Sequence, residues 1–215
     1  MEITAYLDNT DQLKARFFEW RRGLGIVQSL LLALAYACLT GLMAQTSFYL
    51  PWTPVPITGQ TFAVLLGAVL LGRWGGTSQI IYTASGIAGV PWFAGWKGGL
   101  AVIAGPTGGY LIGFIFAAFF VGYFVEKYER SKSYIGLAIL MLLANFVFVY
   151  GFGLAQLYIW LSVIEGSSMG FQYLLSMGAL PFIIGDTVKI LAAVAVAKAA
   201  LPKEKEREMK KYCKL

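Results

Sequence analysis

Two ionisable residues, Asp186 and Lys189, lie in a C-terminal segment that is otherwise long and apolar. Their i, i+3 spacing places both side chains on one face of a helix, within reach of each other. A charged side chain inside a membrane costs about 2.5–3.5 kcal/mol or more, and such residues usually serve a binding site or a transport path. The alternative is a buried ion pair that only fixes helix packing. We interpret the pair as part of a site for a polar solute.

A loop rich in glycine and aromatic residues could complete this site from the outer side of the membrane. It has the sequence PWFAGWKGG, and four of its residues are candidates to contact a ligand: Trp96, Lys97, Gly98 and Gly99. Its tryptophans could instead form an aromatic belt at the membrane surface. The other candidate binding residues are Gln60, Tyr82 and Tyr110, with Gln45 as a further hydrogen-bonding side chain.

The segment GPTGGY at residues 105–110 resembles a phosphate loop only superficially. It lacks the Lys-Ser/Thr ending of a Walker A motif, so we do not expect it to bind a nucleotide. Its glycines allow a sharp helix entry, where free backbone N–H groups could hold an anionic group.

The composition excludes several kinds of enzyme. The chain has no histidine, which rules out Ser-His triads and His-ligated metal sites. Cys38 and Cys213 suggest neither a disulfide nor a thiolate metal site. An intramembrane aspartyl protease needs a second carboxylate beside Asp186, and Glu165 falls in a loop. We therefore expect no enzymatic activity, no cofactor and no metal.

Long charge-free runs predict a membrane protein. Of the 215 residues, 58% are hydrophobic and 13% are charged, and the mean hydropathy is +0.68. No Asp, Glu, Lys or Arg occurs in residues 23–72, 74–96, 98–125, 133–164 and 166–185. A membrane-spanning helix needs about 20 residues, and each run is that long or longer. Prolines 51, 54 and 56 divide the first run. We predict an all-α fold of six transmembrane helices and no soluble domain.

The first two helices are expected at about 24–45 and about 60–71. The third runs from the GRWGG turn to near 91, and the fourth follows the PWFAGWKGG loop and ends near 125. The last two are expected at about 134–163 and about 171–199. The second and third look short, so they could be tilted or flanked by re-entrant loops.

The basic residues predict the orientation. With the N-terminus in the cytoplasm, all 17 Lys and Arg lie inside except Lys97 and Lys189. Both termini are then cytoplasmic: residues 1–22 form an N-terminal segment, 23–200 the membrane domain and 201–215 a charged tail. Topology and anionic lipid account for the net charge of +6 without nucleic acid as a partner.

A stripe of small residues on the first helix, Ala33, Ala37 and Gly41, would let another helix approach closely. That helix could belong to a partner protein or to the chain's own bundle.

Four motifs occur in order along the chain: PVPITGQT (54–61), LLGRWGGTSQIIYTASGIAGVPWFAG (70–95), GPTGGYLIGF (105–114) and PFIIGDTVK (181–189). Together they resemble the BioY family, the biotin-specific S components of energy-coupling-factor (ECF) transporters. The resemblance implies a six-helix S-component fold in the cell membrane that captures biotin from outside with high affinity. It also implies docking on a transmembrane T protein that carries two cytoplasmic ATPases, which alone use ATP.

The resemblance assigns roles to residues of this chain. Asp186 and Lys189 match the ligand residues of the PF-x-x-GD-x-x-K motif, and Ala33 and Ala37 match the AxxxA docking motif of S components. Biotin would offer its ureido N–H groups to Asp186 and its ureido carbonyl to Lys189 or to a side-chain amide. Its carboxylate would meet the outer loop with Lys97.

Two alternatives remain open from the sequence. One is an S component for another small vitamin. The other is an ion-coupled secondary transporter with Asp186 as the coupling carboxylate, although the chain shows no inverted repeat of the kind such transporters carry.

Overall fold

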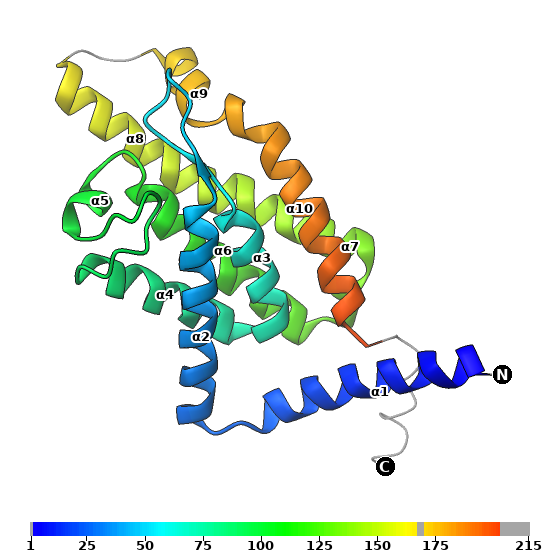
Figure 1. Ribbon diagram of the computed structural model, residues 1–215. Helices are drawn as coiled ribbons and strands as arrows, with labels where there is room; N and C mark the ends of the chain where they lie inside the picture. Colours follow the sequence, from blue (N-terminus) through cyan, green and yellow to red (C-terminus); the bar gives the residue numbers. More distant parts are fainter. Residues whose placement is uncertain (1, 167–169, 203–215) are drawn as a thin grey trace.

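The computed structural model describes residues 2–166 and 170–202, and these residues form a helical bundle with one helix projecting from its base (Figure 1). The projecting helix is α1 (Glu2–Gly23). The bundle is made of α2 (Ile26–Gln45), α3 (Gln60–Leu71), α4 (Arg73–Ile87), α6 (Gly108–Lys127), α7 (Tyr134–Leu143), α8 (Tyr150–Glu165) and α10 (Leu180–Ala200). A π-helical segment, η2 (Ala144–Val149), joins α7 to α8 without a break.

Short elements connect these helices. A two-stranded antiparallel pair, β1 (Ser47–Phe48) and β2 (Ile57–Thr58), lies between α2 and α3. The others are α5 (Leu100–Ala104) before α6, the 3-10 helix η1 (Glu129–Lys132) before α7 and α9 (Phe171–Gly178) before α10.

Four helical stretches among the described residues are long and apolar enough to cross a membrane. They are Ile26–Gln45, Gly108–Lys127, Tyr134–Val163 and Leu180–Ala200. The second and third predicted helices correspond to α3 and α4, which are shorter, with 12 and 15 residues. Large apolar side chains stay exposed on the outer faces, including Leu31 and Leu42 of α2 and Ile184 and Val188 of α10. Such faces suit contact with lipid.

The structure differs from the sequence expectation at two helices. The last helix, expected to be continuous over 171–199, is broken at Ala179, whose φ of −131° and ψ of −59° are not helical. Pro181 then occupies the first turn of α10, where its missing N–H costs nothing. The N-terminal segment also contains a regular helix, α1, which the sequence analysis did not predict. Most of the predicted tail, from residue 203 on, lies outside the described residues.

The central helix is α6, which contacts α3, α4, α7 and α8. Glycines allow these close contacts. A Cβ on Gly113 would lie 2.7 Å from the Phe148 carbonyl oxygen and 2.7 Å from the Val149 Cα. Gly72, at the turn between α3 and α4, has a φ of +61°, which a residue with a side chain rarely adopts. The turn therefore depends on its glycine.

Candidate functional site

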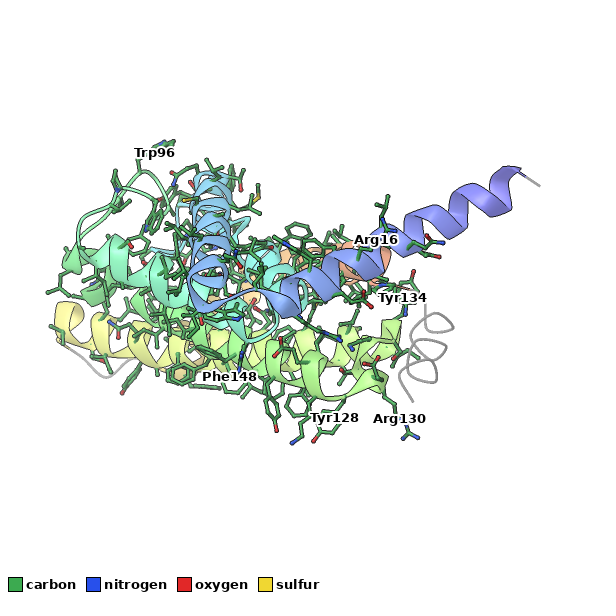
Figure 2. The ribbon with its side chains drawn as sticks, turned by 90° about the horizontal axis from the view of Figure 1, so that it is seen from below. Arg16, Trp96, Tyr128, Arg130, Tyr134 and Phe148 are labelled. Carbon is green, nitrogen blue, oxygen red and sulfur yellow. The ribbon has the colours of Figure 1, made fainter. Side chains whose placement is uncertain are left out.

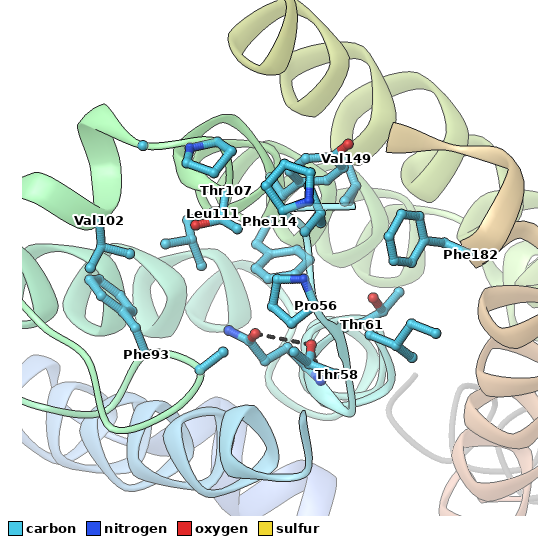
Figure 3. A pocket seen from close by; sticks show the side chains of 18 of the residues that line it. Pro56, Thr58, Thr61, Phe93, Val102, Thr107, Leu111, Phe114, Val149 and Phe182 are labelled. Carbon is cyan, nitrogen blue, oxygen red and sulfur yellow. Dashed lines mark hydrogen bonds between the residues drawn. The ribbon is translucent and has the colours of Figure 1, made fainter. Parts of the chain in front are cut away.

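A cavity of about 310 Å³ opens between the β1–β2 region, the start of α6, η2, α8 and α10. Its wall is mainly apolar, and Figure 3 shows Pro56, Val102, Leu111, Phe114 and Phe182 around it. Phe93 and Val102 lie on one side and Phe182 on the other (Figure 3). A volume of this size is at the lower end of the range for small-molecule sites, about 300–1,000 Å³.

Asp186 forms the polar centre on the α10 side of this cavity. Its side chain is 7% exposed. Lys189 Nζ donates to Asp186 Oδ1 at 2.8 Å, and the Tyr150 hydroxyl donates to Oδ2 at 2.8 Å. Asn145 Nδ2 donates to the same Oδ2 at 3.3 Å. The predicted pair is thus an ion pair that two further side chains orient.

The π-helical segment explains why Asn145 and Tyr150 act together. Residues five apart lie on different faces of a regular α-helix, with its 3.6 residues per turn. Here the Tyr150 N–H donates to the Asn145 carbonyl, an i to i+5 bond that stacks the two residues on one face. The widened turn therefore brings both side chains to Asp186. Neither residue was predicted from the sequence, because a π-turn has no clear sequence signal.

The site keeps unused hydrogen-bonding capacity. A carboxylate has about four lone-pair sites, of which Asp186 uses three, and an ammonium has three N–H donors, of which Lys189 uses one. Asn145 Oδ1 is buried without a hydrogen-bond partner among the described residues. One end of the cavity can therefore both accept and donate hydrogen bonds while its ion pair stays electrically balanced.

The opposite side of the cavity carries a cation. Lys97 lines the cavity, with its Nζ 5.8 Å from the centre of the Tyr49 ring. Its backbone pairs with Phe93, through N···O distances of 2.9 and 3.3 Å, so the loop folds back as a narrow turn. This places a positive charge across the cavity from the Asp186–Lys189 pair.

Other residues predicted in the outer loop have different positions. Trp96 does not line the cavity: it is 67% exposed, has a φ of 58° and lies at the edge of the molecule in Figure 2. Gly98 and Gly99 also lie outside the cavity wall. Gly98 packs against the Val90 carbonyl, which a Cβ would approach to 2.6 Å. Both glycines shape the loop.

Gln60 lines the cavity, and Tyr82 lies behind it. Gln60 Nε2 donates to the Tyr82 hydroxyl at 2.9 Å, and that hydroxyl donates to the Trp92 carbonyl at 3.1 Å. Thr58 donates to Gln60 Oε1 at 3.0 Å (dashed line in Figure 3). Tyr82 is fully buried and does not line the cavity; through these hydrogen bonds it positions Gln60 and the loop.

Gln45 and Tyr110 are also tied to the backbone. Gln45 Nε2 donates to the Trp92 and Phe93 carbonyls, and its Oε1 accepts from the Trp96 N–H. Tyr110 lines the cavity, while its hydroxyl donates to the Gly178 carbonyl at 2.7 Å, at the break between α9 and α10. Both side chains hold chain segments in place around the cavity.

The small residues of α2 lie inside the bundle. Ala33 and Ala37 are 0% exposed, and the face that contains them turns toward α4, where Gln79 donates to Thr40 at 3.2 Å. A Cβ on Gly41 would come within 3.1 Å of Trp92. In this structure the stripe packs inside the bundle, and docking of a partner protein on these residues stays a prediction.

Comparisons with known proteins agree with these features. The profile of the BioY family matches residues 11–206. The probable biotin transporter BioY of Methanothermobacter thermautotrophicus is 48% identical over 140 residues, covering 65% of this chain and 89% of that protein. The biotin transporter BioY of Thermotoga maritima is 36% identical over 159 residues, covering 74% and 88%.

A solved structure is also similar. The crystal structure of the S component for biotin from an ECF-type ABC transporter has a TM-score of 0.70 and 28% identity, and the match covers 82% of this chain and 94% of that one. The fold, the motifs around the cavity and the extent of the family match lead to one conclusion: this chain belongs to the BioY family.

Proposed function

We propose that this chain is the biotin-binding S component of an ECF-type importer in the cell membrane. The observation that carries the proposal is the cavity itself, in which the Asp186–Lys189 pair faces Lys97 across apolar walls. Biotin has a polar ureido ring at one end, a carboxylate at the other and an apolar thiophane and valeryl chain between them. The polar and apolar parts of biotin therefore match those of the cavity from one end to the other.

The pose follows from the hydrogen-bonding capacity of each end. The ureido N–H groups donate to Asp186, whose carboxylate lines the cavity and keeps a free lone pair. The ureido carbonyl accepts from Lys189. The thiophane ring then lies among Phe114, Phe182 and their neighbours, and the carboxylate reaches Lys97.

The topology of the proposal is six membrane segments with both termini in the cytoplasm. The cavity then opens toward the outside, where biotin is captured, because it lies at the Gln45 end of α2 and the basic N-terminal segment lies at the Ile26 end. The chain has no Walker A motif, so the energy for release comes from a T protein and two ATPases. The relative whose structure is solved is named as part of such a transporter.

Titration calorimetry on the purified, detergent-solubilised chain tests the binding step. We expect tight biotin binding that Asp186→Asn weakens at least tenfold, because the variant loses a charge-assisted hydrogen bond. Glu126→Gln, at the other end of the bundle, is the matched control and should leave binding unchanged. Lipoate, which shares the valeryl carboxylate and lacks the ureido ring, should not bind. A folded wild type without biotin affinity would refute the proposal.

Uptake in cells separates the ECF mechanism from ion coupling. We expect biotin uptake only when the T protein and ATPases are co-expressed, and expect it to persist with an uncoupler while ATP is maintained. Uptake that collapses with the proton gradient at constant ATP would instead favour the secondary transporter.

A further inference from the structure

A second, smaller cleft lies at the opposite end of the bundle from the biotin cavity. It has a volume of about 200 Å³ and is lined by residues from α1, α2, the start of α4 and the end of α6. A water occupies roughly 30 Å³ in the liquid, so the cleft has room for an oxyanion the size of a phosphate group. The proposed biotin site uses none of these residues.

The side chains of the cleft carry excess positive charge. Arg21, Arg22 and Arg73 line it, and Glu126 is the one acidic residue among its lining residues. The first residues of two helices, Ile26 of α2 and Arg73 of α4, also line it. Helix N-termini carry partial positive charge and free N–H groups, which adds to the attraction for an anion.

Arg21 is the strongest sign that a ligand is missing from this cleft. Its side chain is 7% exposed, and its Nε and Nη1 are buried without a hydrogen-bond partner among the described residues. Nη1 lies 3.3 Å from Glu126 Oε1, in an ion pair without hydrogen-bond geometry. A buried, unsatisfied donor costs about 1–3 kcal/mol, and more when it is charged. An acceptor from outside the chain would remove that cost.

Glu126 does not fully compensate Arg21. Burial lowers the pKa of the Arg21 guanidinium, and the Glu126 carboxylate offsets only part of that effect. The Glu126 side chain is 35% exposed, so its carboxylate also faces solvent.

The surroundings of the cleft favour a lipid as the source of the anion. Ile26 lines the cleft and is 72% exposed, and Val27 and Leu30 beside it are 70% and 41% exposed. These side chains form an apolar strip on the outer face of α2, along which acyl chains could lie. Trp74, in the cleft wall, has the amphipathic ring that suits the membrane interface.

We propose that the cleft binds the phosphate of one anionic phospholipid, with Arg21 and Arg73 as its ligands and the acyl chains against α2. In the proposed topology this lipid belongs to the cytoplasmic leaflet. It would join α1 to the starts of α2 and α4 and so fix the base of the bundle.

Native mass spectrometry of the purified chain tests the proposal. The probes are phosphatidylglycerol, phosphatidylcholine and inorganic phosphate. We expect one phosphatidylglycerol per chain, retained at least fivefold more than phosphatidylcholine. Arg21→Gln and Arg73→Gln should each reduce this binding at least fivefold. The matched control is Arg130→Gln, which removes an exposed arginine from η1 and should have no effect.

The thermal unfolding midpoint of each variant shows whether it is folded. It also provides a second readout, because phosphatidylglycerol should raise the midpoint of wild type and of Arg130→Gln but not of Arg73→Gln. A third outcome is that inorganic phosphate stabilises wild type but not Arg73→Gln, while phosphatidylglycerol does not bind. The cleft would then be an anion site, and the proposal that the anion belongs to a lipid would be overturned. Equal retention of both lipids, or the same binding in the Arg21, Arg73 and Arg130 variants, would overturn the proposal.

Discussion

The Tyr150 hydroxyl lies 2.8 Å from Oδ2 of Asp186, and the two residues are 36 positions apart, at the start of α8 and in the first half of α10. This bond fixes the carboxylate from the side opposite Lys189, whose Nζ is bound to Oδ1. The carboxylate thus has one defined orientation before any ligand arrives. Preorganisation of this kind lowers the cost of binding.

Tyr150→Phe removes this hydrogen bond and keeps the ring. We expect biotin affinity to fall about tenfold. A hydrogen bond to a charged group contributes about 1.5–3 kcal/mol, but the substitution also removes this bond from the unliganded protein, so only part of that energy is lost from binding. Calorimetry on the purified variant measures the change. Tyr158→Phe, on the exposed side of the same helix, is the control. Equal affinities in both variants would show that Tyr150 does not orient the carboxylate.

The Asp186–Lys189 pair should show strong coupling in a double-mutant cycle. Lys189→Met leaves the carboxylate buried without its cation, which costs about 3–5 kcal/mol of folding stability. In the double variant Asp186→Asn/Lys189→Met no charge remains, so it should be more stable than Lys189→Met alone. Thermal unfolding of the four proteins in one detergent measures this. Additive effects of the two substitutions would mean that the pair is not coupled.

Lys97 should recognise the negative charge of the ligand. Lys97→Gln should weaken binding of biotin about fivefold, roughly the 1 kcal/mol expected of an ion pair near the surface. It should leave binding of biotin methyl ester unchanged, because the ester has no charge for Lys97 to neutralise. Lys127→Gln, at the other end of α6, is the control for the loss of a cation. If the ratio of the affinities for biotin and for its methyl ester were the same in Lys97→Gln as in wild type, Lys97 would not recognise the carboxylate.

The sequence predicted the parts of this molecule that follow from local pattern. Charge-free runs located the apolar segments of the bundle, though not α1 or the break at Ala179, and the i, i+3 spacing predicted the contact of Asp186 with Lys189, since both depend on one stretch of chain. Contacts between distant segments could not be predicted in this way. The positions of Tyr150 and Asn145 depend on a π-turn, and Trp96, although it is adjacent to Lys97 in the chain, does not line the cavity.

The stripe of small residues shows the same limit. A row of alanines and glycines predicts a close approach of two helices but does not identify the second helix. In α2 the second helix is the chain's own α4. A close contact of the same kind occurs in α6, where a Cβ on Gly113 would lie 2.7 Å from both the Phe148 carbonyl oxygen and the Val149 Cα. Those two residues belong to the π-helical segment that places Asn145 and Tyr150.

Gly113→Ala should therefore affect stability and binding together. The added methyl has no room against the backbone of η2, and overpacking of this kind costs about 1–3 kcal/mol. The unfolding midpoint should fall by roughly 2–4 °C for each kcal/mol at this chain length. Biotin affinity should fall too, because the displaced π-turn carries the two donors to Asp186.

Gly151→Ala is the matched control for this prediction. Gly151 is also helical, on α8, and nothing lies within 4 Å of the position that its Cβ would take. Alanine is favoured over glycine in a helix by about 0.8–1.0 kcal/mol, so this variant should be as stable as wild type or more stable, with unchanged biotin binding. If Gly113→Ala lowered the midpoint but kept full biotin affinity, the contact with η2 would serve packing alone, and the π-turn would hold its donors without it.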